Sequence, residues 1–241
     1  LTHDASNDRM QELWRQSYNG INRANVAIDK IALISSANIS EQNRERYINE
    51  AKFLRALHYF NLVRWFGGVP LVLHEVTTLT KENLYVSNAS EDVVYEQIIN
   101  DLKDAENLPA TIEYSAENKP RASSGAAKSL LSKVYLTRQQ WQLAADKSKE
   151  VIDSQVYGLF DDFADVFNVA TKNGKEHIFS AQFKGFSNWN GNQLAGTGAP
   201  LVVPGINGSQ ADALHKEGGL YESYDEHDIR RNVTFVTQWV S

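Results

Sequence analysis

Glycine and proline are distributed very unevenly along this chain, and their distribution limits where helices can form. Residues 1–66 contain one glycine and no proline, whereas residues 185–219 contain eight of the fourteen glycines and two of the five prolines. Helices exclude these two residue types and irregular loops use them. The sequence therefore predicts a mainly α fold, with a helical body over residues 1–177 and a loop-rich C-terminal segment of the same domain over residues 178–241.

The composition excludes several classes of protein. The 241 residues include 24 basic and 30 acidic side chains, for a net charge of −6, and no cysteine. A chain with this balance lacks the basic surface typical of nucleic-acid binding, so we expect no nucleic-acid partner. The lack of cysteine excludes disulfides, thiolate metal sites and cysteine nucleophiles. No apolar run approaches the roughly 20 residues that span a bilayer.

Apolar residues at helical spacing predict a series of helices in the body. The spacing indicates helices over about 8–34, 41–66, 91–108, 123–137 and 141–154. Ser40 and Ser90 are suited to N-caps, because each precedes an acidic first turn. Gly67, Gly68 and Pro70 end the second helix, and Val69–His74 is expected to be a short strand or an extended segment.

The side chains expected in the core follow from the same spacing. On the second helix, the buried side is predicted to carry Tyr47, Ala51, Leu54, Leu57 and Leu62. Three tryptophans lie among apolar neighbours on helices, and we expect them to pack in the core or between helices. These are Trp14, Trp65 and Trp141.

An internal similarity suggests repeated helical hairpins. Residues 51–60 and 127–136 share Ala, Lys, Leu and Tyr at equivalent positions, and each segment is followed by a tryptophan. Small residues at close-packing points and a tyrosine near the turn are typical of tetratricopeptide-like repeats. The alternative is that two amphipathic helices share alanines and leucines by chance. The pattern favours tetratricopeptide-like helical-hairpin repeats.

The run YINEAKFLRALHYFNLVRWFGGVPL, from Tyr47 to Leu71, closely resembles the signature helix of the SusD/RagB family. Those proteins are nutrient-binding lipoproteins on the outer membranes of Bacteroidetes. Further segments resemble family elements in the expected order, around Trp14–Asn25, Ala127–Ile152 and Tyr157–Phe179. Asp228-Ile229-Arg230 resembles the family's Asp-Pro-Arg element, with isoleucine in place of proline.

The resemblance implies a fold, a function and a location. It implies a SusD-like α/α superhelix with long loops that bind a glycan or peptide without catalysis, and the ligand we expect is an oligosaccharide. It implies a SusC-like TonB-dependent transporter as partner and a position at the outer-membrane cell surface. The membrane would be reached through a lipid anchor on a cysteine absent from this chain. Family members are about twice as long, so we expect this chain to be the middle of one.

One loop combines the residue types that sugars require. Asn188, Trp189 and Asn190 lie in a glycine-rich stretch with further amides. A tryptophan offers a flat apolar face for a pyranose ring, and amides bond its hydroxyl groups. The alternative is that Trp189 packs against the body while the amides form turns. We interpret the three residues as candidate ligand-binding residues.

A second aromatic set lies near the end of the chain. Tyr221, Tyr224 and Trp239 have acidic and basic neighbours, and they are also candidate ligand-binding residues. The alternative is that they pack on a part of the protein beyond this chain. Tyr85, in the polar stretch 75–90, is a third candidate.

The sequence gives no support to an enzyme. It lacks the serine-nucleophile, zinc-protease and phosphate-loop motifs, so we expect no catalytic residue and no cofactor. Acidic residues between Glu222 and Asp228 fit no calcium loop, and we expect a solvated surface there and no metal. A second hypothesis is a tetratricopeptide-like adaptor whose helices bind a protein. It predicts that alanine at Trp189 has no effect on binding.

Overall fold

The computed structural model describes residues 8–78, 80–183 and 219–235. Contacts divide the chain into two compact units, residues 1–158 and residues 159–241. The division into a helical body and a loop-rich segment at residue 178 stays a prediction. The elements are α1 (Asp8–Ala32), α2 (Glu41–Phe66), α3 (Lys81–Leu84), α4 (Glu91–Ala105), η1 (Thr111–Glu113), α5 (Ser124–Thr137), α6 (Trp141–Asp153), η2 (Phe163–Val166), η3 (Val169–Thr171) and α8 (Ile229–Thr234).

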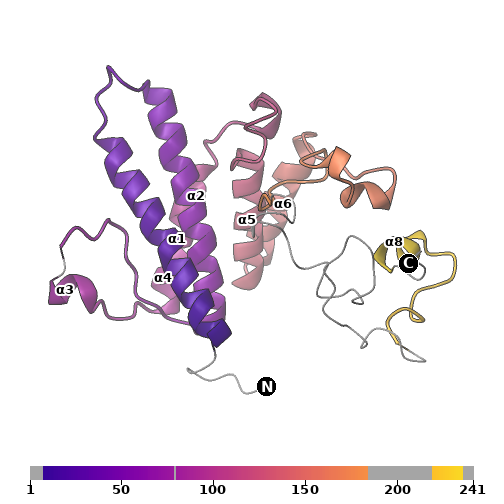
Figure 1. The fold of residues 1–241 in the computed structure, drawn as a ribbon, viewed down its shortest axis with the longest axis horizontal. Helices are drawn as coiled ribbons and strands as arrows, with labels where there is room; N and C mark the ends of the chain where they lie inside the picture. Colours follow the sequence, from indigo (N-terminus) through magenta and orange to yellow (C-terminus); the bar gives the residue numbers. More distant parts are fainter. Residues whose placement is uncertain (1–7, 79, 184–218, 236–241) are drawn as a thin grey trace, which may run out of the picture. The chain divides into compact units, whose positions relative to one another are not determined.

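The helices of the first unit pack in chain order. Helix α2 packs on α1 and on α4, and α5 packs on α4 and on α6. Figure 1 shows α1 beside α2 and α5 beside α6. The predicted mainly helical class is confirmed: no sheet forms within residues 8–78, 80–183 and 219–235, where Pro70 and Asn88 make an isolated bridge. None of the helices described is both long and apolar enough to cross a membrane.

The predicted helix ends are confirmed where local chemistry sets them. The Ser40 hydroxyl accepts from the Asn43 amide at 3.3 Å, and the Ser90 hydroxyl accepts from the Val93 amide at 3.4 Å. Helix α2 ends at Gly67, which has a φ of 70° and donates its amide hydrogen to the Val63 carbonyl. A positive φ is easy only for glycine, so this residue stops the helix at the signature run.

The extended segment 69–75 lies against α1 and α2 and is fixed there by side chains. Tyr18 donates its hydroxyl hydrogen to the Pro70 carbonyl at 2.7 Å. The Tyr59 hydroxyl accepts from the Val72 amide at 2.7 Å and donates to the Val72 carbonyl at 2.9 Å. Burial raises the pKa of Tyr59 to about 12. Side chains of α1 and α2 thus make the hydrogen bonds to this backbone that neighbouring strands would make in a sheet.

A buried polar network joins this segment to α4. Arg55 donates to both carboxylate oxygens of Asp101 at 2.8 Å, and it also donates to the Asn25 side-chain oxygen and the Leu73 carbonyl at 2.9 Å. Arg55, Asp101 and Asn25 are all buried. A buried charge is tolerated when it is paired and its remaining donors are satisfied. The network therefore ties α1, α2, α4 and the extended segment together.

Three expected core residues are in fact exposed. Trp65 is 59% exposed and Trp141 is 61% exposed, so the core prediction is wrong for both. Leu54 is 42% exposed, although α2 packs against both α1 and α4. Trp14 does pack between helices, with ring centroids 5.0 Å from both Tyr18 and Phe66.

The described residues of the second unit are mostly short turns. Phe160 donates its amide hydrogen to the Glu176 carboxylate at 2.7 Å, and its ring lies 5.7 Å from that of His177. Helix α8 contacts η2 within this unit. Asp228 caps α8 by accepting from the Arg230 amide, so the Asp-Ile-Arg element begins a helix without its proline.

Alanine at Gly68 is expected to destabilise the first unit. A Cβ there would lie 2.5 Å from the Ala89 carbonyl oxygen, and that backbone is held by a hydrogen bond from the Ala89 amide to the Val69 carbonyl. Overpacking of this kind costs about 1–3 kcal/mol. Urea unfolding measures the loss. The matched control is Gly158→Ala, where a Cβ would meet nothing within 4 Å; equal losses in the two variants would refute the steric account.

Acid is expected to weaken the packing of α1 on α2 through His58. Its ring lies against Gly20, and burial lowers the pKa of His58 below the ordinary value of about 6.5. As the pH falls, His58 is protonated in the unfolded chain before it is protonated in the folded protein. The contribution of neutral, buried His58 to the free energy of unfolding is therefore complete above about pH 6.5, and it is lost as the pH falls toward the folded-state pKa. Thermal unfolding at a series of pH values should show a shallower acid dependence for His58→Gln. An acid dependence that is unchanged in His58→Gln would contradict this role of His58.

Candidate functional site

Four of the six predicted ligand-binding residues lie outside the described residues. These are Asn188, Trp189, Asn190 and Trp239. Their role as ligand-binding residues stays a prediction from sequence chemistry. Tyr221 and Tyr224 are described, and both belong to the second unit.

The structure brings the two tyrosines together around a third aromatic ring. The ring centroids of Tyr221 and Tyr224 lie 5.4 and 5.6 Å from that of Phe235, both edge to face. The Arg231 guanidinium lies over the Tyr221 ring, 4.0 Å from its centroid. Both tyrosines are half-buried. The cluster thus supplies a partly exposed aromatic surface, although Arg231 covers one face of Tyr221.

The charges around this cluster are mostly paired with one another. Arg230 donates to both oxygens of Asp228, at 2.9 Å from Nε and 2.5 Å from Nη2, and these bonds lower the pKa of Asp228. His227 lies 3.1 Å from the Asp225 carboxylate. Within the described ranges, no group of three His, Asp or Glu side chains could hold a metal ion.

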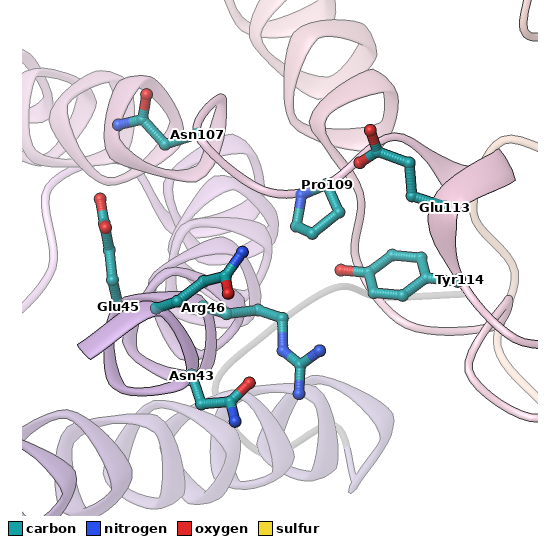
Figure 2. A pocket seen from close by; sticks show the side chains of 8 residues that line it. Asn43, Glu45, Arg46, Asn107, Pro109, Glu113 and Tyr114 are labelled. Atoms are coloured by element: carbon teal, nitrogen blue, oxygen red, sulfur yellow. The ribbon is translucent and has the colours of Figure 1, made fainter. Parts of the chain in front are cut away.

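A separate pocket of about 410 Å³ lies in the first unit (Figure 2). One wall is the start of α2, with Gln42, Asn43, Glu45 and Arg46. The other wall follows α4 and includes η1, with Asn107, Pro109, Glu113 and Tyr114. Figure 2 shows the Arg46 guanidinium extending from α2 between the two walls.

The polar groups of this pocket are largely uncommitted. In the part of the chain that the structure describes, the side chains of Gln42, Asn43 and Asn107 make no hydrogen bond, and the buried Nε of Arg46 has no partner. The Tyr114 hydroxyl, in contrast, donates to the Ala122 carbonyl at 2.8 Å, and burial raises the pKa of Tyr114 to about 12. The pocket can therefore offer several donors and acceptors to a small polar ligand.

The third candidate, Tyr85, is 79% exposed at the end of α3. Its loop is anchored where the Ala89 amide donates to the Val69 carbonyl at 3.0 Å, and inside the loop the Asn83 side-chain amide donates to the Thr78 carbonyl at 3.0 Å. A surface ring on an anchored loop can present an aromatic face to a ligand.

The chain belongs to the SusD-like family. The family described as "Starch-binding associating with outer membrane" matches residues 2–136. The predicted SusD-like membership is thereby confirmed. The family's association with the outer membrane agrees with the membrane that we expected, and the lipid anchor stays a prediction.

Named relatives support the same assignment. SusD-like protein P2 of Formosa agariphila is 30% identical over 98% of this chain and 47% of its own length. A laminarin-binding SusD-like protein is 36% identical, with a TM-score of 0.63 over 69% of this chain and 36% of its own. A crystal structure with a xylogluco-oligosaccharide is 25% identical, with a TM-score of 0.69 over 86% of this chain and 42% of its own. This chain therefore spans about half, or less, of each of these proteins.

The Arg46 pocket was not evident from the sequence. Its two walls come from the start of α2 and from the turn after α4, which are far apart in the chain. The only local signal is a polar first turn in α2, and that is equally typical of an exposed helix end. The exposure of Trp65 and Trp141 was missed because apolar neighbours along a helix do not determine which face is covered.

Proposed function

We propose that this chain is the part of a cell-surface protein that binds an oligosaccharide without catalysis. The observation that carries the proposal is membership of the SusD-like family, whose description names starch binding. Two similar proteins support it, since one binds laminarin and the other has a crystal structure with a xylogluco-oligosaccharide.

Aromatic and amide side chains are proposed to hold the glycan. Trp189 would stack on a pyranose ring while Asn188 and Asn190 bond its hydroxyl groups. Tyr221 and Tyr224, with Trp239, would supply a second aromatic contact. The partly exposed edge-to-face cluster around Phe235 supports this role for the two tyrosines.

Retardation in native gels tests the ligand class. The 241-residue protein is run through gels that contain laminarin, xyloglucan or starch, beside a non-binding reference protein. We expect retardation in at least one of them, with the reference unaffected. Free migration in all three gels would argue against the proposed function.

A SusC-like TonB-dependent transporter is the proposed partner, and a lipid anchor is the proposed attachment to the outer membrane. Both follow from the family, whose description names association with that membrane. Mild detergent extraction of outer membranes, followed by capture of the whole protein that contains this chain, should recover a TonB-dependent transporter in comparable amount. Recovery of the protein alone, or from the soluble fraction only, would oppose this proposal.

A protein-binding adaptor is the second candidate. The observation in its favour is that Trp65 and Trp141 are more than half exposed on the helices. Exposed aromatic residues are enriched at protein interfaces. The adaptor predicts partner capture that is lost in Trp65→Ala or Trp141→Ala and is unchanged in Trp189→Ala.

A further inference from the structure

The pocket at Arg46 has a size and a set of polar groups that suit one sugar ring. Its volume of about 410 Å³ lies at the lower end of the range of about 300–1,000 Å³ that is usual for small-molecule sites. Its walls belong to α2, η1 and the turn after α4, all within the first unit. One wall is therefore a long helix, and the other is the turn after α4 together with η1.

Arg46 is held in place by a ring rather than by hydrogen bonds. Its guanidinium lies over the Tyr47 ring, 4.7 Å from the centroid. Arg121, which is paired with the Glu50 carboxylate, lies 5.5 Å from the centroid of the same ring. Stacking fixes the Arg46 guanidinium and leaves its N–H groups without a partner among the described residues. Buried donors without a partner are uncommon in folded proteins, and the Arg46 Nε–H is one.

The surrounding groups indicate the kind of ligand. Gln42, Asn43 and Asn107 carry amides that both donate and accept. Glu45 and Glu113 carry carboxylates that accept, and the Glu113 carboxylate already accepts from the Ala110 amide at 2.9 Å. Sugar hydroxyl groups also both donate and accept, so they match such a mixed set. Two carboxylates against one guanidinium disfavour an anionic ligand. The half-buried ring of Pro109 is a small apolar contact suited to a C–H face.

We propose that this pocket is a second saccharide subsite, which takes one neutral pyranose unit with Arg46 as its central donor. The proposal rests on the proposed glycan-binding function for the class of its ligand. The pocket shares no residue with the predicted ligand-binding set at 188–190, 221, 224 and 239. The subsite would be a saccharide contact made by the helical unit alone.

Nuclear magnetic resonance of the full 241-residue protein tests the subsite. The probe is D-glucose, a neutral hexopyranose, and D-glucuronate is the anionic comparator. The signals followed are the Arg46 Nε–H, assigned by its loss in Arg46→Lys, and the Asn107 side-chain amide. We expect glucose to shift both signals saturably, and glucuronate to act more weakly. No saturable shift with glucose, or a shift with glucuronate alone, would overturn the proposal.

Substitutions separate binding from folding. Arg46→Met keeps an unbranched side chain over Tyr47 and should weaken glucose binding, followed at Asn107, by about tenfold. Asn107 is exposed, and Asn107→Ala should weaken the binding seen at Arg46 by about fivefold without affecting the fold. The matched control is Arg23→Met, an exposed arginine of α1, which should leave the affinity unchanged. Equal weakening by Arg23→Met and Arg46→Met would contradict a specific site.

The loop variant distinguishes this subsite from the main proposed function. Trp189→Ala should leave the glucose-induced shifts at Arg46 and Asn107 in place. If those shifts occur while the chain binds no polysaccharide, the proposed function fails and the subsite stands. If polysaccharides bind and glucose leaves Arg46 unshifted at every concentration, the subsite is refuted and the proposed function stands.

Discussion

Replacing Asp101 with asparagine is expected to lower the free energy of unfolding by about 3–5 kcal/mol, the usual cost of breaking a buried ion pair from one side. The side chains of Asp101 and Arg55 are 2% and 6% exposed. Asparagine has nearly the same shape, but it leaves the Arg55 charge uncompensated inside the protein. Arg55 also holds the Leu73 carbonyl and Asn25. Urea unfolding followed by circular dichroism measures the loss.

The matched control lies on the same two helices. Lys52 of α2 and Asp104 of α4 form an ion pair of 2.6 Å, but their side chains are 23% and 52% exposed. Solvent weakens such a pair, so Asp104→Asn should cost about 0–1 kcal/mol. Similar costs for Asp101→Asn and Asp104→Asn would contradict the role given to burial.

Alanine at Trp189 is expected to weaken glycan binding at least tenfold. Aromatic residues at the centre of a binding site contribute about 2 kcal/mol or more when they are truncated, and 1.4 kcal/mol corresponds to a factor of ten. Calorimetry with an oligosaccharide of whichever polysaccharide retards the protein measures the change. The free energy of unfolding should stay the same, because the expected role of Trp189 is contact with the ligand.

Trp141→Ala is the control for this prediction. Trp141 is 61% exposed on α6, so it offers an accessible ring outside the proposed site. Its replacement should leave the glycan affinity within a factor of two. An unchanged affinity in Trp189→Ala, or equal losses in the two variants, would assign glycan binding to a different surface.

Features set by neighbouring residues could be predicted from the sequence. The caps at Ser40 and Ser90 and the stop at Gly67 depend on residues within one helical turn, and the structure confirms all three. The bond between Arg55 and Asp101 joins residues 46 positions apart, and no local pattern indicates it. The exposure of Leu54 also depends on distant segments. Helix α2 packs against two helices, and the spacing of its apolar residues does not show which of its faces they cover.

The candidate site was predictable only in its chemistry. Aromatic and amide residues in a glycine-rich stretch indicate a sugar ligand. The edge-to-face packing of Tyr221 and Tyr224 on Phe235, in contrast, depends on how the chain folds and could not be predicted. The Arg46 pocket needs two distant segments to meet, so its residues look ordinary when they are read one at a time. Family membership supplied the function class, because the signature run is long and continuous.

The central claim is that this chain binds a glycan. Its most direct test is calorimetric titration of the unaltered 241-residue protein with oligosaccharides of laminarin and xyloglucan, the ligands named for two similar proteins. The account predicts saturable binding to at least one of them, with the oligosaccharide recovered at its original length. Absence of binding to both, or recovery of shortened products, would contradict it.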